Sequence, residues 1–281
     1  MKATTIRSGL ADLAIESTGS GPPVVLLHAG VADRRMWAHQ LATLAGAGFA
    51  AHAYDRRGFG ESLHVDEEYS HANDLLAILD HVSPRRPALL VGCSQGGRIA
   101  IDACLARPGR VGALMLVSTA VSGAPGPGPT PPAIEAWIAR LDQAEAANDV
   151  DAINALEAHA WLDGPLERDG RIGGAIRELF LAMNEMALRA EQRGTELPPA
   201  AAWTRLSEIR VPTLVTWGDL DFPHVAAVGD HAARTIPQAR RHVFKGAAHL
   251  PSLEQPVAFD RLLVDFCRAG AKGPADRPAR P

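Results

Sequence analysis

Short apolar runs alternate with amphipathic helical patterns along most of this chain. The apolar runs are nearly continuous, which is typical of strands buried on both faces of a parallel sheet. They lie at residues 24–27, 49–54, 88–92, 113–118, 213–217 and 241–244. Helical patterns separate them at about 34–45, 70–82, 95–106, 224–235 and 256–268. This order predicts an α/β fold with a mostly parallel, doubly wound sheet, preceded by a hairpin at about 3–17.

The alternation stops between the fourth and fifth apolar runs. Residues 123–131, GAPGPGPTP, are too rich in proline and glycine for a helix or strand, and helical patterns follow from Pro132 to about Ala190. We therefore expect a helical cap at 123–208, inserted into a core formed by 1–122 and 209–269. Residues 270–281 have no apolar content to pack, so we expect a disordered tail there.

Composition narrows the cellular context and the partners. Hydrophobic residues make up 47% of the 281, enough for a buried core. The net charge of −4 and the scattered basic residues give no reason to expect nucleic acid as a partner. No apolar run approaches the roughly 18 residues that cross a bilayer, and the N-terminus lacks a secretory h-region. Cys93, Cys104 and Cys267 have no metal-like spacing. We expect a soluble, cytoplasmic protein without a membrane partner, metal site or disulfide framework.

The stretch VGCSQGGR, residues 91–98, places Ser94 among three glycines between an apolar run and a helical pattern. A strained strand-to-helix turn of this kind, with the G-x-S-x-G pattern, presents a serine oxygen to a substrate. A serine hydroxyl needs a neighbouring base and an orienting acid to act as a nucleophile at neutral pH. The turn therefore predicts that Ser94 is a catalytic nucleophile.

Candidates for the acid and the base follow later strands, where ligands bind in open α/β sheets. Asp219 and Asp221 come after the strand at 213–217, and His249 comes after the strand at 241–244. His249 is favoured as the base, because His224 opens a helical pattern and His242 lies within a strand pattern. Residue patterns alone do not separate the two aspartates.

An oxyanion site requires N–H donors near the nucleophile. The Gln95 amide, at the start of the helix after Ser94, is one predicted donor, since a helix N-terminus favours negative charge. The second is expected from the loop HAGVADRRMW, where Ala29 and Gly30 allow the backbone close to a ligand.

With these residues assembled, the chain resembles the α/β-hydrolase superfamily, and more narrowly cap-bearing serine esterases, enol-lactonases and meta-cleavage hydrolases. The resemblance covers about residues 3–268 and rests on five motifs in order, HAGVADRRMW, YDRRGFGES, VGCSQGG, WGDLD and GAAHLPSLEQP. It implies a Ser94–His249–Asp221 triad, with Asp221 three residues after Gly218, and an oxyanion donor at Gly30. It also implies no cofactor. One departure is Ala29, where the family usually has glycine.

The resemblance implies acyl transfer to water, and the cap is expected to choose the substrate. Four cap residues are candidates for an apolar pocket, namely Trp161, Phe180, Met183 and Met186. The expected substrate is a small to medium, largely apolar carboxylic ester or lactone. Three alternatives remain: carbon–carbon bond hydrolysis of the meta-cleavage type, a cofactor-free haloperoxidase-like activity, and a non-catalytic ligand-binding receptor. The dienol carboxylate of a meta-cleavage substrate would require an arginine in the pocket. The sequence leaves a homodimer open.

Overall fold

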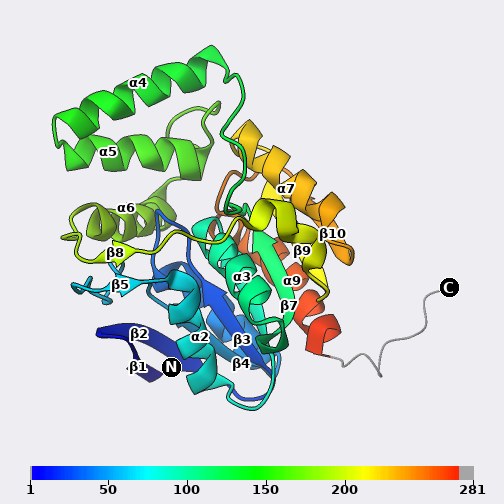
Figure 1. The fold of residues 1–281 in the computed structure, drawn as a ribbon. Helices are drawn as coiled ribbons and strands as arrows, with labels where there is room; N and C mark the ends of the chain where they lie inside the picture. Colours follow the sequence, from blue (N-terminus) through cyan, green and yellow to red (C-terminus); the bar gives the residue numbers. More distant parts are fainter. Residues whose placement is uncertain (1, 272–281) are drawn as a thin grey trace.

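The computed structural model describes residues 2–271 and contains an eight-stranded sheet in the order β1-β2-β4-β3-β6-β7-β9-β10 (Figure 1). The strands are β1 Lys2–Ser8, β2 Ala11–Thr18, β3 Pro23–Leu27, β4 Ala50–Tyr54, β6 Ala88–Cys93, β7 Val111–Val117, β9 Thr213–Gly218 and β10 Ala239–Phe244. The β1–β2 hairpin is antiparallel and β2 pairs antiparallel with β4, whereas the pairs from β4 to β10 are parallel. The predicted mostly parallel α/β sheet with an opening hairpin is confirmed.

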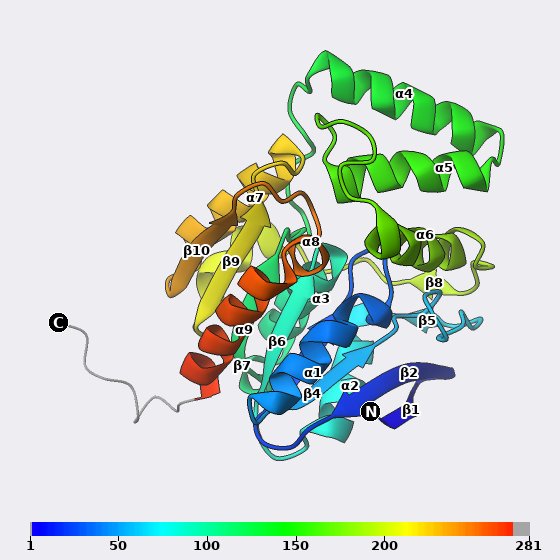
Figure 2. The ribbon, with the colours of Figure 1, turned by 180° about the vertical axis from the view of Figure 1, so that it is seen from behind.

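Helices cover both faces of the sheet. On one face lie α1 (Ala38–Gly46) and α9 (Pro256–Ala271), and on the other lie α2 (His71–Val82), α3 (Gln95–Ala106) and α7 (Pro223–Thr235) (Figures 1 and 2). Shorter helices are η1 Arg34–Trp37, η2 Pro108–Arg110, η4 Ala202–Glu208 and α8 Pro251–Glu254. Because successive strand side chains point to opposite faces, Val24 and Val25 enter two different hydrophobic clusters.

The inserted segment forms a helical layer above the carboxyl ends of the strands (Figure 1). It contains α4 (Pro132–Ala146), α5 (Val150–Glu157), the π-helical turn η3 (Ala158–Asp163) and α6 (Gly174–Leu188). The short strand β8 (Thr195–Glu196) then pairs with β5 (Glu68–Tyr69) of the core. The helices of this layer lie within the predicted cap segment, 123–208.

Apolar and charged contacts attach this cap to the core. Phe180 and Met183 are fully buried in the same cluster as residues of α1 and α9. Arg171 donates to the Gly246 carbonyl at 3.0 Å and pairs with the buried carboxylate of Glu254 on α8. The cap is therefore packed onto the core rather than connected only through its two linkers.

Helix α9 continues to Ala271, so the predicted start of the tail at residue 270 is wrong by two residues. Residues 270 and 271 complete the last helical turn, where Gly270 packs closely against Leu89 and Ala113. The rest of the predicted tail, 272–281, lies outside the described residues. None of the helices within 2–271 combines the length and the apolar character that a bilayer crossing requires.

Candidate active site

Ser94 occupies a strained turn between β6 and α3. Its backbone has φ 53° and ψ −115°, a conformation that non-glycine residues seldom adopt and that occurs where function demands it. The Ser94 N–H donates to the Val117 carbonyl at 2.8 Å, while the Ser94 carbonyl accepts from Ala120 at 3.1 Å. These bonds hold the turn against the end of the neighbouring strand, β7.

The three glycines around Ser94 allow backbone to approach backbone. A Cβ on Gly92 would lie within 3.0 Å of the Gly96 carbonyl, and one on Gly96 would collide with the Leu27 carbonyl of β3. A Cβ on Gly97 would meet the Thr119 side chain. The glycines therefore let α3 begin directly against the strands, which is the packing that raises the serine to the sheet edge.

His249 and Asp221 form a buried pair on neighbouring loops. The His249 Nδ1 lies 2.7 Å from Asp221 Oδ2, and the other carboxylate oxygen accepts from the Phe222 amide at 2.7 Å. Both side chains are almost completely buried. Because Asp221 accepts at Nδ1, the Nε2 atom of His249 is the nitrogen available to take a proton.

The structure separates the alternatives that the sequence left open. Asp219 accepts from the Gly246 amide at 2.6 Å and pairs with Lys245, so it holds the histidine loop rather than the imidazole. His224 lies at the start of α7, lines the cavity, and has a pKa lowered by burial. His242 is exposed on β10, at the edge of the sheet.

Gly30 and Gln95, the two predicted oxyanion donors, lie against each other and line the same cavity as Ser94. Gln95 begins α3, so its amide is a first-turn N–H without an intrahelical acceptor. A Cβ on Gly30 would lie 2.8 Å from the Gln95 side-chain nitrogen. The loop after β3 and the start of α3 therefore approach each other at this part of the cavity, with the Gln95 side chain packed against Gly30.

Arg56 connects the loop after β3 to the start of α3, and the sequence analysis did not single it out. Its guanidinium is 1% exposed, donates to Gln95 Oε1 at 2.7 Å and to the Ala29 carbonyl at 3.2 Å, and lies over the Phe59 ring. The Arg56 amide also donates to His28 Nε2 at 3.0 Å. Burial without a carboxylate partner lowers the pKa of Arg56 to about 10. The sequence signal for this role was the pair of adjacent arginines in DRRG. Arg57 forms ion pairs with acidic residues, whereas Arg56 is left to bind the loop and Gln95.

A cavity of about 410 Å³ joins these groups. Its lining combines polar residues at the sheet edge with apolar residues from the cap hinge and from α7. The lining residues are Gly30, Val31, Ser94, Gln95, Ser118, Thr119, Ala120, Val121, Ala124, Pro125, Glu157, Trp161, His224, Val225, Val228 and His249. Trp161 packs its ring 4.5 Å from the His249 ring, centroid to centroid. Ser94 and His249 thus line one cavity, to which the cap contributes Glu157 and Trp161.

Three of the four predicted pocket residues lie elsewhere. Trp161 lines the cavity, but Phe180 and Met183 are fully buried where α6 packs onto the core. Met186 is exposed on the far part of α6 and its sulfur accepts from Arg35. The apolar face of α6 is used to attach the cap, so it is not available to a substrate.

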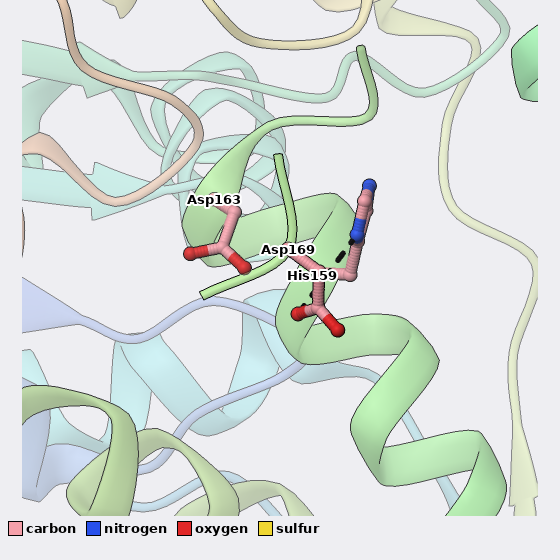
Figure 3. A group of neighbouring side chains, drawn as sticks. All are labelled: His159, Asp163 and Asp169. Atoms are coloured by element: carbon pink, nitrogen blue, oxygen red, sulfur yellow. Dashed lines mark ion pairs between the residues drawn. The ribbon is translucent and has the colours of Figure 1, made fainter. Parts of the chain in front are cut away.

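A second group of ligand-type side chains, His159, Asp163 and Asp169, lies in the cap outside this cavity (Figure 3). Arg177 donates to both carboxylates, at 2.6 Å to Asp163 and 2.7 Å to Asp169. Asp163 also accepts from the amides of Gly170 and Ile172. The guanidinium and the backbone therefore already satisfy the negative charge, and the group is explained as a structural link within the cap.

A family model for the alpha/beta hydrolase fold matches residues 22–256. The chain belongs to this family. The α/β hydrolase is 28% identical to a 2-hydroxy-6-oxo-6-phenylhexa-2,4-dienoate hydrolase of Burkholderia cepacia, over 95% of this chain and 96% of that protein. It is 25% identical to a pimeloyl-[acyl-carrier protein] methyl ester esterase of Vibrio atlanticus, over 89% of this chain and 96% of that protein.

Among solved structures, it is similar to the esterase RhEst1 from Rhodococcus sp. ECU1013, with a TM-score of 0.75 and 25% identity, over 96% of this chain and 99% of that chain. The protein is therefore a hydrolase.

Proposed function

We propose that this α/β hydrolase cleaves small to medium, largely apolar carboxylic esters or lactones through an acyl-enzyme on Ser94. The observation that carries the proposal is that the strained Ser94 turn and His249, whose Nδ1 is paired with Asp221, line one cavity. A cavity of about 410 Å³ lies within the usual range for small-molecule sites, which sets the size class of the substrate.

In the proposed reaction His249 Nε2 takes the proton of the Ser94 hydroxyl as Oγ attacks the substrate carbonyl carbon. The Gly30 and Gln95 amides donate to the resulting oxyanion, and each such donor typically contributes roughly 3–4 kcal/mol to lowering the barrier. The carbon–oxygen bond to the alcohol breaks, and the alcohol leaves with the proton from His249. Water then attacks the acyl-enzyme, passes a proton to His249, and releases the acid as the proton returns to Ser94.

The charge of the cavity favours esters and lactones over the dienoates that the Burkholderia cepacia relative is named for. A dienoate substrate would bring a carboxylate into the cavity, and a buried carboxylate requires a cationic partner. The residues that line the cavity include neither lysine nor arginine, and their charged member is Glu157. A carboxylate substrate would therefore meet repulsion rather than pairing.

The proposal is tested with p-nitrophenyl esters of increasing acyl length. We expect wild type to hydrolyse them with an optimum set by the cavity, and Ser94→Ala to reduce kcat by at least about 10⁴-fold. Ser207→Ala, a change at an exposed serine on η4, is the matched control and keeps wild-type turnover. Hydrolysis retained by Ser94→Ala would contradict the proposal, and turnover of dienoates without turnover of esters would favour carbon–carbon hydrolysis instead.

A further inference from the structure

Glu157 is the cap residue that contributes an acidic side chain to the lining of the cavity. It is the last residue of α5 and lines the same cavity as Ser94 and His249. The buried Asn184 of α6 donates to Glu157 Oε2 at 2.6 Å and to Asn154 Oδ1 at 3.0 Å. Asn154 in turn donates to the Leu181 carbonyl. This chain of hydrogen bonds between two cap helices holds the carboxylate in one position.

The carboxylate of Glu157 lacks a cation to balance it. No arginine, lysine or histidine within residues 2–271 forms an ion pair with it, and Asn184 is the one described residue that donates to it. Burial and the neighbouring Glu145 raise the pKa of Glu157 above its ordinary value. A carboxylate kept in such a place costs free energy unless a ligand supplies the opposite charge.

The surroundings of Glu157 suit an organic cation. Trp161, four residues further along, lines the same cavity, and aromatic faces attract ammonium groups. The remaining lining is mostly small or apolar, and the lining residues include neither lysine nor arginine that would repel such a group. A hydroxyl could also donate to the carboxylate, but it would leave the charge uncompensated.

We propose that Glu157 determines substrate specificity by binding an ammonium group carried by the ester or lactone, at a distance from the carbonyl that reacts with Ser94. This inference rests on the proposed function, because it places the ammonium group on the substrate of the Ser94 site. The substrate class becomes an amino-substituted, otherwise apolar ester or lactone. Asn184 is then a positioning residue that orients the carboxylate toward the cavity.

The test compares p-nitrophenyl esters of ω-amino acids of increasing length with the same esters carrying a methyl group in place of the ammonium. Each kcat/KM is divided by the rate of the uncatalysed hydrolysis of that ester. We expect wild type to prefer the ammonium ester of matching length by roughly 10- to 100-fold, the range of a charge-assisted hydrogen bond. Glu157→Gln keeps the shape and the bond from Asn184, and should bring the ratio close to one.

Glu135→Gln is the matched control, because it removes the same charge from an exposed position on α4 and should keep the wild-type ratio. Ser94-dependent hydrolysis of both esters with a wild-type ratio near one would overturn the inference and leave the proposed function standing. A preference that survives in Glu157→Gln would overturn it as well.

If neither ester is hydrolysed, the proposed function fails, and a binding measurement then tests the cation site on its own. The p-nitroanilides of the same two acids are amides, which resist hydrolysis. Their binding to Ser94→Ala is measured by calorimetry without turnover. Tighter binding of the ammonium anilide, lost when Glu157→Gln is added, would establish the cation site independently of catalysis. Equal binding of the two anilides would overturn it.

Discussion

Arg56 holds the loop after β3 in place, although it lies in a different loop, after β4. Its guanidinium connects the Ala29 carbonyl of the loop after β3 to the Gln95 side chain at the start of α3. The loop has alanine at position 29, where the family usually has glycine. Under the proposed function, we interpret Arg56 as a positioning residue that holds the Ala29–Gly30 loop against the start of α3, where the two proposed amide donors lie.

Arg56→Met keeps an unbranched apolar stem, shorter than that of arginine, and removes both hydrogen bonds. We expect kcat for p-nitrophenyl esters to fall by roughly 10- to 100-fold with KM changed less than threefold, because a shifted oxyanion donor acts on the transition state. Arg85→Met, at an exposed arginine, is the control. A folded Arg56→Met protein with wild-type kcat would refute this role.

His52 on β4 couples stability to pH. Its Nδ1 lies 2.8 Å from Ser17 Oγ, its Nε2 is buried without a partner, and burial together with His81 lowers its pKa to about 4. The unfolded chain binds a proton near pH 6.5, whereas the folded protein does not until about pH 4. This contribution to stability is therefore complete above pH 6.5 and is lost as the pH falls toward 4.

The measurement is the free energy of unfolding by urea at several pH values between 7.5 and 5. We expect His52→Gln to lose less stability than wild type over this interval, by about 1.4 kcal/mol per pH unit below pH 6. Glutamine keeps a partner for Ser17 and does not titrate. Parallel pH curves for the two proteins would show that His52 is not the source of the dependence.

At the scale of elements, the short helix α8 fixes the loop that carries His249. Its Glu254 accepts from the amides of Ala248 at 2.8 Å and Leu250 at 3.1 Å, one on each side of the histidine. The same carboxylate pairs with Arg171 of the cap. This one side chain joins the loop that carries His249, α8 and the cap.

Glu254→Gln retains the size of the side chain but removes the charge and one acceptor. We expect kcat to fall roughly tenfold with a smaller change in KM, since the base is displaced from its working geometry. Glu208→Gln, an exposed change on η4, is the comparison that should retain wild-type kcat. An unaltered kcat in Glu254→Gln would mean that the loop holds its geometry without α8.

The core elements could be predicted from sequence because their signals are local. The apolar run at 88–92 corresponds to β6, and the helical pattern at 95–106 corresponds to α3. Both patterns depend only on residues close together in the sequence. Ser94 and His249 could be singled out for the same reason, as each follows a strand.

Features that depend on distant partners could not be predicted in this way. Periodicity shows that α6 has an apolar face, but it does not show that Phe180 and Met183 use this face to contact the core. The same limit applies to Arg56 and Glu157. Their importance comes from carbonyl, amide and cavity neighbours that only the folded chain brings together.

For the whole molecule, the shared hydrophobic cluster predicts that the cap and the core unfold together. Phe180 of α6 belongs to the cluster that also contains Trp37 and Phe259 from the core. Phe180→Ala should lower the free energy of unfolding by about 3–5 kcal/mol, as for other buried phenylalanines. Differential scanning calorimetry should show one transition shifted to lower temperature. A separate early transition for the cap would contradict this coupling.

Labelling with a fluorophosphonate tests whether Ser94 is the nucleophile. Ser94 Oγ displaces fluoride at phosphorus, so we expect one phosphonate per chain, on the peptide containing Ser94. Loss of ester hydrolysis should follow the labelled fraction in direct proportion. Full hydrolytic activity in a labelled protein, or a label on a different residue with the same loss, would show that Ser94 is not the nucleophile.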